Sequence, residues 1–174
     1  AEPPAIAKTS PLKYSLLWSA AHNRITANLI REIDTLLLDG PCVTYNGDQR
    51  VKVTATGLYT YPDVMIVCGE ARYDSADPDT LLNPTVLIEV LSPSTEAYDR
   101  GAKFAHYRSL DSLREYLLVA QDRPRVERYV RRGEVWELST HEGLDATFPL
   151  GCVEEEVPLA GVYNRVALPE NPGR

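Results

Sequence analysis

"TVLIEVLSPST", residues 85–95, is an apolar run interrupted by a single carboxylate, that of Glu89. Large aliphatic residues flank Glu89 on both sides, and a short continuous apolar run of this kind predicts a strand that is buried on both faces. An ionised carboxylate in such a strand loses its hydration, which is unfavourable unless a cation or hydrogen-bond donors compensate. Glu89 therefore needs a partner from elsewhere in the chain.

The strongest candidate for a neighbour is Asp63, at the start of the apolar stretch "DVMIVC", residues 63–68. If the two strands pair antiparallel, the start of the first lies beside the end of the second, and the two carboxylates meet. Two close carboxylates repel each other, so a hard divalent cation is a natural third party. A buried salt bridge between Glu89 and an arginine is the alternative.

A lysine is predicted to approach the same place from the helix that follows. Pro93 precedes the helix-start residues Ser94–Thr95, and helical polarity continues to about residue 110. Asp99, Lys103 and Tyr107 are spaced by four and share one face, so the Lys103 ammonium can point back at the sheet. An exposed Asp99–Lys103 pair and a packing role for Tyr107 are the structural alternatives.

Two carboxylates, a cation and a lysine suit phosphodiester hydrolysis. The metal would polarise the phosphate and activate water, while Lys103 would stabilise the pentavalent charge or position the nucleophile. Hydrolysis at a sugar by the same two carboxylates is a weaker alternative, because such sites normally need open grooves lined by aromatic residues.

The remaining elements predict a mixed α/β protein with one central sheet. An amphipathic helix is expected over residues 19–38, where apolar residues recur every three or four positions, and residues 70–84 are expected to form a long exposed loop. Strands are expected over residues 41–46, 50–56, 63–68, 85–91, 114–120, 124–133 and 134–140. Residues 154–163 are expected to add a short strand or a helical turn.

Length and composition fit a single domain of 174 residues with 44% hydrophobic residues. No apolar run approaches the roughly 18 residues that span a bilayer, and the N-terminus lacks the pattern of a signal peptide, so a cytoplasmic protein without membrane association is expected. The net charge of −7 disfavours a broad nucleic-acid-binding surface. One basic cluster interrupts this acidity: Arg123, Arg125, Arg128, Arg131 and Arg132.

The chain has three cysteines, Cys42, Cys68 and Cys152, and they are far apart in sequence. Their number is odd and no C-x-x-C spacing occurs, so reduced core thiols are expected rather than a disulfide, a zinc site or a nucleophile.

"YPDVMIV", residues 61–67, followed by "PTVLIEVLSPST" and "DRGAKFAHY", resembles the bacterial "putative restriction endonuclease" family, a branch of the PD-(D/E)XK nuclease superfamily. The resemblance extends over about residues 22–135. It implies a restriction-endonuclease-like core, in which helices flank a mixed central sheet, here with extra antiparallel strands at the C-terminal end. It further implies a Mg²⁺-dependent active site in which Mn²⁺ can substitute, DNA as the substrate, and a homodimer. Strands near residues 126–129 and 135–138 are expected at the sheet edge as the dimer interface.

The resemblance also implies roles for individual residues. Asp63 and Glu89 match the metal-binding motif residues, and Lys103 matches a lysine that has moved onto the helix. His22 and Asp48 match supporting positions, although a core histidine and a turn residue are the structural alternatives. The superfamily places its lysine two residues after the motif Glu, where this chain has Leu91.

Two hypotheses follow from these residues. The first is a Mg²⁺-dependent DNA endonuclease that uses Asp63, Glu89 and Lys103. The second is a nuclease-fold protein without catalytic activity that acts as a binding or assembly module, which Leu91 and the acidic net charge favour. Residues 1–18 match the family poorly and are interpreted as a truncated or atypical N-terminal extension.

Overall fold

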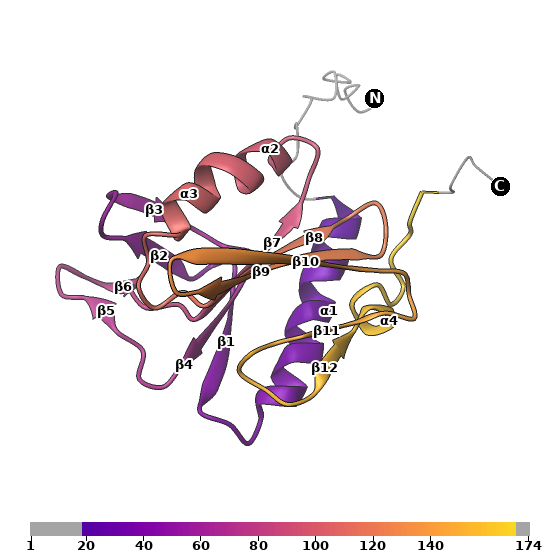
Figure 1. Cartoon of the computed structure of the whole chain (residues 1–174), viewed down its shortest axis with the longest axis horizontal. Coiled ribbons are helices and arrows are strands. Elements are labelled where there is room, and N and C mark those ends of the chain that lie inside the picture. Colours follow the sequence, from indigo (N-terminus) through magenta and orange to yellow (C-terminus); the bar gives the residue numbers. More distant parts are fainter. Residues whose placement is uncertain (1–18, 170–174) are drawn as a thin grey trace, which may run out of the picture.

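The fold is built on a six-stranded mixed sheet that has helices on both of its sides in the computed structural model (Figure 1). The structure describes residues 19–169, so the predicted N-terminal extension lies outside it. The strands of this sheet, in spatial order, are β1 (Cys42–Asn46), β4 (Val64–Cys68), β7 (Val86–Leu91), β8 (Glu115–Ala120), β9 (Arg125–Arg132) and β10 (Val135–Glu142). Only β7 and β8 run parallel, and the other neighbours are antiparallel. The predicted fold class, a mixed α/β core with additional antiparallel strands, is confirmed.

Helix α1 (Ala20–Leu37) covers one face of this sheet. The Ser19 side chain accepts a hydrogen bond from the backbone N–H of His22 and so caps the first turn. Ile25, Leu29 and Ile33 are spaced by four, and all three are fully buried in the core shared with β4, β7 and β8. The helix predicted from the amphipathic pattern, and the face that it buries, are therefore confirmed.

A second helical segment covers the opposite face, and it consists of α2 (Glu96–Tyr98), the π-helical turn η1 (Asp99–Lys103) and α3 (Phe104–Tyr107). Along β7 successive side chains point to opposite faces, so Ile88 and Val90 meet the α1 side. Leu87 and Leu91 pack with the second helical segment. Glu89 lies between these two leucines and therefore faces η1 and α3.

A second, four-stranded sheet overturns the predicted loop over residues 70–84. Its strands, in spatial order, are β3 (Leu58–Thr60), β2 (Arg50–Val53), β6 (Asp77–Leu81) and β5 (Tyr73–Asp74). The polar residues that indicated a loop form ion pairs across this sheet, between Arg50 and Asp77 and between Lys52 and Asp74. The expected central sheet is present, and this four-stranded sheet is an addition that was not expected.

The C-terminal part forms both elements that were expected there. β12 (Glu156–Pro158) pairs antiparallel with β11 (Thr147–Pro149), and the helical turn α4 (Leu159–Val162) follows directly. The Asn28 amide anchors this turn to α1 by donating to the carbonyl oxygens of Val162 and Asn164.

The predicted sheet edges were right for one strand and wrong for the other. β10 is an edge strand, but β9 lies between β8 and β10 and is hydrogen-bonded on both sides. The second edge of the sheet is β1. Among residues 19–169, no helix combines the length and the apolar character that crossing a bilayer requires.

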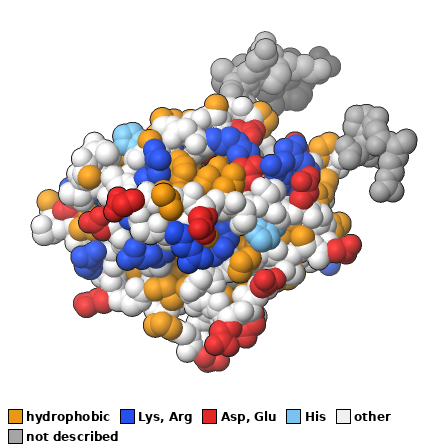
Figure 2. Space-filling model, in the orientation of Figure 1, with side chains coloured by type: hydrophobic (Ala, Val, Ile, Leu, Met, Phe, Trp, Pro, Cys, Tyr) orange, Lys and Arg blue, Asp and Glu red, His pale blue; other side chains and the backbone are white. Residues whose placement is uncertain are grey.

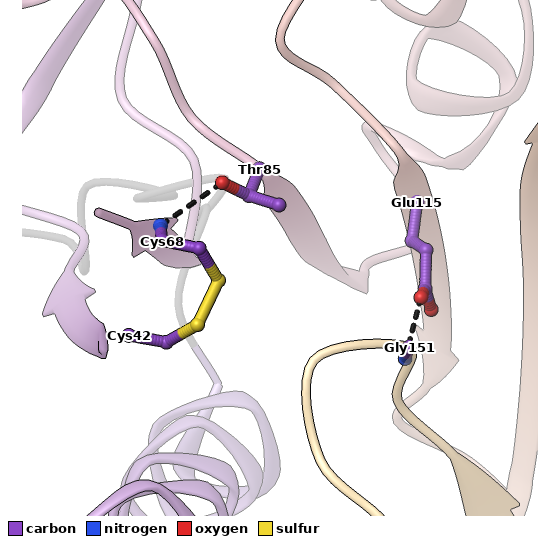
Figure 3. Close-up of a disulfide and its surroundings, with 5 residues drawn as sticks. All are labelled: Cys42, Cys68, Thr85, Glu115 and Gly151. Carbon is purple, nitrogen blue, oxygen red and sulfur yellow. Dashed lines mark hydrogen bonds between the residues drawn. A yellow bond between two sulfur atoms is a disulfide. The ribbon is translucent and has the colours of Figure 1, made fainter. Parts of the chain in front are cut away.

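The prediction of reduced thiols was wrong for two of the three cysteines, because Cys42 and Cys68 form a disulfide (Figure 3). The two residues are 26 positions apart in the chain but directly opposite each other in the antiparallel pair of β1 and β4, with Cα atoms 4.0 Å apart. Spacing along the sequence carries no information about this contact, which depends on which strands are neighbours. Cys152 is a free thiol.

Candidate active site

A cavity of about 210 Å³ lies where β4 begins and β7 ends, next to α2 and η1. The residues that line it are His22, Tyr61, Asp63, Glu89, Val90, Thr95, Asp99 and Lys103. They come from α1, from the segment directly before β4, from β7, and from η1 and the residue that precedes α2. The cavity thus brings together four of the residues that the sequence singled out: His22, Asp63, Glu89 and Lys103.

The antiparallel register of β4 and β7 brings the two strand carboxylates together. Val64 is paired with Ile88, so the preceding Asp63 lies level with Glu89. One oxygen of Asp63, Oδ2, accepts the backbone N–H of Val90 at 2.8 Å and lies 3.2 Å from Nε2 of His22. Asp63 is therefore held in place by the strand that carries Glu89 and by the first turn of α1.

Glu89 is 3% exposed, and its charge partner is a lysine rather than an arginine. Its Oε1 lies 2.7 Å from Nζ of Lys103 and accepts a hydrogen bond from the Tyr107 hydroxyl at 2.9 Å. The pKa of Glu89 is raised to about 7 as the net result of burial, which raises it most, of Lys103, which lowers it, and of the negative charges of Asp63 and Asp99, which raise it. The carboxyl group consequently titrates near neutral pH.

Lys103 lies between two buried carboxylates. Besides Glu89 it contacts Oδ1 of Asp99 at 3.1 Å, one π-helical turn earlier. Asp99 is 2% exposed, so the alternative of an Asp99–Lys103 pair on an exposed face was wrong. Burial by itself lowers the pKa of Lys103, but the charges of Glu89 and Asp99 raise it, and the net direction is upward. Lys103 is therefore a permanently charged ammonium at neutral pH, held in a type of turn that is frequent at functional sites.

Tyr107 combines a packing role with a polar one. Its ring meets the edge of the Tyr116 ring, and its hydroxyl lies 3.3 Å from Oγ1 of Thr60 while it donates to Glu89. Burial and the nearby Glu89 charge raise the pKa of Tyr107 well above its ordinary value, so the hydroxyl keeps its proton. The alternative of a packing role for Tyr107 therefore accounts for its ring but not for its hydroxyl group.

Asp48 does not belong to this arrangement. It lies in the exposed turn between β1 and β2, where its backbone N–H donates to Oδ1 of Asn46, and it is not among the residues that line the cavity. Its position matches the structural alternative of a turn residue. Conversely, Tyr61, Thr95 and Asp99 line the cavity without having been assigned to it. Of these three residues, only Asp99 could have been assigned from the sequence, because it lies four positions before Lys103 and so shares its helical face.

The basic cluster on β9 is largely neutralised. Figure 2 shows Lys and Arg side chains over the face crossed by β9 and β10, with Asp and Glu side chains among them. Four ion pairs account for most of the cluster: Arg123–Asp122, Arg125–Glu127, Arg128–Glu115 and Arg132–Glu137. The guanidinium of Arg131 stacks over Trp136. These arginines therefore offer less positive potential than their number indicates.

The fold defines the class of protein, because it is shared with a solved structure of a "putative nuclease". A solved structure described as "a putative nuclease belonging to DUF820" from Anabaena variabilis ATCC 29413 is similar over 85% of this chain and 83% of that chain, with a TM-score of 0.69. The sequence identity is 15%, so this similarity establishes the fold.

The family can be stated more narrowly. The Uma2 family, described as "Putative restriction endonuclease", matches residues 18–157, and the chain belongs to this family. Two relatives come from Synechocystis sp. (strain ATCC 27184 / PCC 6803 / Kazusa). The uncharacterized protein sll1609 is 36% identical over 129 residues, which are 74% of this chain and 73% of that protein. The uncharacterized protein slr1290 is 33% identical over 128 residues, which are 73% of this chain and 66% of that protein.

Proposed function

We propose that this chain is a cytoplasmic, metal-dependent endonuclease that hydrolyses phosphodiester bonds in DNA. Asp63 and Glu89 would be the ligands of Mg²⁺, for which Mn²⁺ can substitute. The observation that carries the proposal is the convergence of two strand carboxylates and the Lys103 ammonium on one cavity. Membership of a family described as "Putative restriction endonuclease" supports the reaction class.

The way the carboxylates are held supports cation binding. Both contacts of Asp63 fall on Oδ2, and both contacts of Glu89 fall on Oε1. Each group is thus oriented through one oxygen, and we assign the other, Oδ1 of Asp63 and Oε2 of Glu89, to the cation. Carboxylate oxygens are the ligands that hard divalent cations prefer. The raised pKa of Glu89, which is due first to burial and then to the charges of Asp63 and Asp99, supports the same assignment, because a cation would stabilise the ionised carboxylates.

In this proposal the other side chains around the carboxylates orient them and stabilise the negative charge of the transition state. A bound Mg²⁺ would supply Lewis-acid polarisation of the phosphate and activation of a water molecule. The Lys103 ammonium would donate to a phosphate oxygen as negative charge develops in the transition state, and Asp99 keeps this ammonium charged and fixed. His22 orients Asp63, and Tyr107 orients Glu89.

Leu91 is no obstacle to this arrangement. It occupies the position of the superfamily lysine, but it is 5% exposed and packs in the core beneath the second helical segment. Lys103 reaches the carboxylate of Glu89 from η1 instead. The ammonium of the active site would therefore come from the helix rather than from the strand.

Cleavage of supercoiled plasmid DNA tests the proposal. Wild-type protein is expected to nick or linearise the plasmid with Mg²⁺ or Mn²⁺, and a chelator should stop the reaction. Asp63→Ala should abolish cleavage, whereas Asp48→Ala, which removes an exposed acidic residue outside the cavity, should leave it unchanged. Equal activity of wild type and Asp63→Ala would exclude the assignment.

The second candidate is a nuclease-fold module that binds or assembles without cleaving, which the apolar Leu91 and the net charge of −7 favour. Calorimetric titration with Mg²⁺ and Mn²⁺ separates the two candidates. The endonuclease requires a binding isotherm that Asp63→Ala abolishes, while the module predicts no binding heat in either protein.

We further propose that cutting both strands of a duplex uses a homodimer, since residues 19–169 of each chain form one cavity with this set of residues. β10 is the edge strand that could mediate it, and it exposes the apolar side chains of Val135 and Leu138. Light scattering of wild type and of Leu138→Lys tests this interface: the wild type should have twice the mass of the chain and the variant the mass of one chain. A monomeric wild type would exclude the dimer.

A further inference from the structure

A second cavity, of about 490 Å³, lies at the other end of the central strands, and all three cysteines of the chain line it. Cys68 ends β4 and Cys42 begins β1, while Cys152 comes from the segment between β11 and β12. Their three Sγ atoms lie within 4.8 Å of one another. This cluster is separate from the Asp63–Glu89 cavity, with which it shares no lining residue.

The fold holds each cysteine in place independently of the disulfide. β1 and β4 pair over five residues each, and the Cys68 N–H also donates to Oγ1 of Thr85 at 3.0 Å. The Gly151 N–H donates to Oε1 of Glu115 at 2.6 Å and so positions the adjacent Cys152 (Figure 3). A Cβ atom at residue 151 would collide with that same oxygen, so any larger residue there would force the Glu115 carboxylate to shift. Reduction of the disulfide would therefore leave three thiols at one place.

We propose that, once the Cys42–Cys68 disulfide is reduced, the three cysteines form a thiolate site for a thiophilic divalent cation such as Zn²⁺. The reductant is a dithiol: it transfers two electrons and two protons to Cys42 and Cys68 and becomes a disulfide itself. The cation then displaces the protons of the three thiols.

The spacing and the chemistry of the cluster fit this ion. Zn–S bonds of about 2.3 Å place the thiolates of one tetrahedral site about 3.8 Å apart, which small side-chain rotations reach from the present positions. Thiolates select soft ions such as Zn²⁺ over Mg²⁺. Because all three cysteines line the cavity, water or an external donor from the cavity would complete the coordination of the ion.

The surroundings suit the charge of such a site. Three thiolates and one divalent cation carry a net negative charge, and four arginines line the same cavity: Arg114, Arg128, Arg131 and Arg132. Arg128 is already paired with Glu115 and Arg132 with Glu137, so Arg114 and Arg131 would balance the charge of the site. In the oxidised protein two of the three ligands are consumed by the disulfide, so metal binding would depend on the redox state.

Titration with Co²⁺ followed by Zn²⁺ tests the site in the full-length protein. Dithiol-reduced, desalted wild type is expected to bind Co²⁺ at the three cysteines with thiolate-to-cobalt charge-transfer bands, and Zn²⁺ should displace this ion and remove the bands. The oxidised protein should show no such bands. Cys152→Ser, which preserves side-chain size, should weaken binding by at least about tenfold, the lower limit for losing even an indirect contact to a metal. Asp63→Ala is the matched control and should leave the bands unchanged, since it lies in the other cavity.

Alkylation provides a readout that needs no variant. Zn²⁺ should protect all three cysteines of the reduced wild type from iodoacetamide, as measured by peptide mass spectrometry. The proposal is overturned if reduced wild type shows no charge-transfer bands, if Cys152→Ser binds Co²⁺ as tightly as wild type, or if Zn²⁺ leaves the thiols unprotected.

Discussion

Nζ of Lys103 lies 2.7 Å from Oε1 of Glu89, and this ion pair joins the π-helical turn η1 to the buried strand β7. Oδ1 of Asp99 lies 3.1 Å from the same ammonium, so Asp99 is the second carboxylate that contacts it. One lysine therefore compensates two carboxylates that are almost completely buried, and the stability of this region and the chemistry of the cavity depend on the same side chain.

Replacing this lysine should affect stability and activity together. Lys103→Gln leaves Glu89 and Asp99 without their cation, and we expect a loss of about 3–5 kcal/mol in the free energy of unfolding, measured with urea. Plasmid cleavage should fall by about 10²–10³-fold. Lys52→Gln, which breaks a more exposed pair with Asp74, is the matched control and should have a much smaller effect on stability and none on cleavage. If the Lys103→Gln variant were as stable as the wild type, the ion pair would not be important for stability.

The Tyr107 hydroxyl should tune the titration of Glu89. Tyr107→Phe removes a donor to Oε1 while keeping the ring against Tyr116, so the pKa of Glu89 should rise and stability should fall by about 1–2 kcal/mol. Tyr163→Phe is the control, because its hydroxyl donates to backbone carbonyls elsewhere. It should lose comparable stability without moving the Glu89 titration, which carboxyl-carbon NMR can follow. If the pKa of Glu89 shifted equally in both variants, the effect could not be assigned to the hydrogen bond from Tyr107.

Metal binding should strengthen as the pH rises through about 7, because protons compete with the cation for Glu89. The folded pKa lies above the ordinary value of 4.5, so the contribution of Glu89 to stability is fully present below about pH 4.5 and is lost as the pH rises through about 7. Stabilisation by Mg²⁺ should consequently be larger at about pH 8 than at about pH 6 in thermal unfolding. Glu89→Gln should remove this dependence, and equal Mg²⁺ effects at both pH values in wild type would contradict it.

Gly151 should be intolerant of a methyl group. In Gly151→Ala the new Cβ meets Oε1 of Glu115, and the collision should cost about 1–3 kcal/mol of stability, measured by chemical denaturation. Gly101→Ala is the matched control, because a Cβ there has no neighbour within 4 Å and the residue lies in a helical turn. That variant should be as stable as wild type or slightly more stable. A Gly151→Ala protein of wild-type stability would show that Glu115 moves without cost.

Local patterns in the sequence determined a large part of this protein. The period of apolar residues identified α1 and its buried face, and the continuous apolar run of residues 85–91 identified β7. The positions of Asp63 and Glu89 in their strands predicted their meeting, because one antiparallel pairing is enough to bring them level. The four-residue spacing of Asp99 and Lys103 placed both on one helical face, although it left open whether that face is buried.

Only the tertiary structure decided the contacts that depend on which strands are neighbours. Cys42 and Cys68 meet because β1 lies beside β4, and Cys152 joins them through a segment far along the chain. The polar stretch of residues 70–84 became strands because its aspartates pair with Arg50 and Lys52 of β2. Periodicity reports how one element is buried, whereas these contacts join elements whose order in space is set by the packing of the whole sheet.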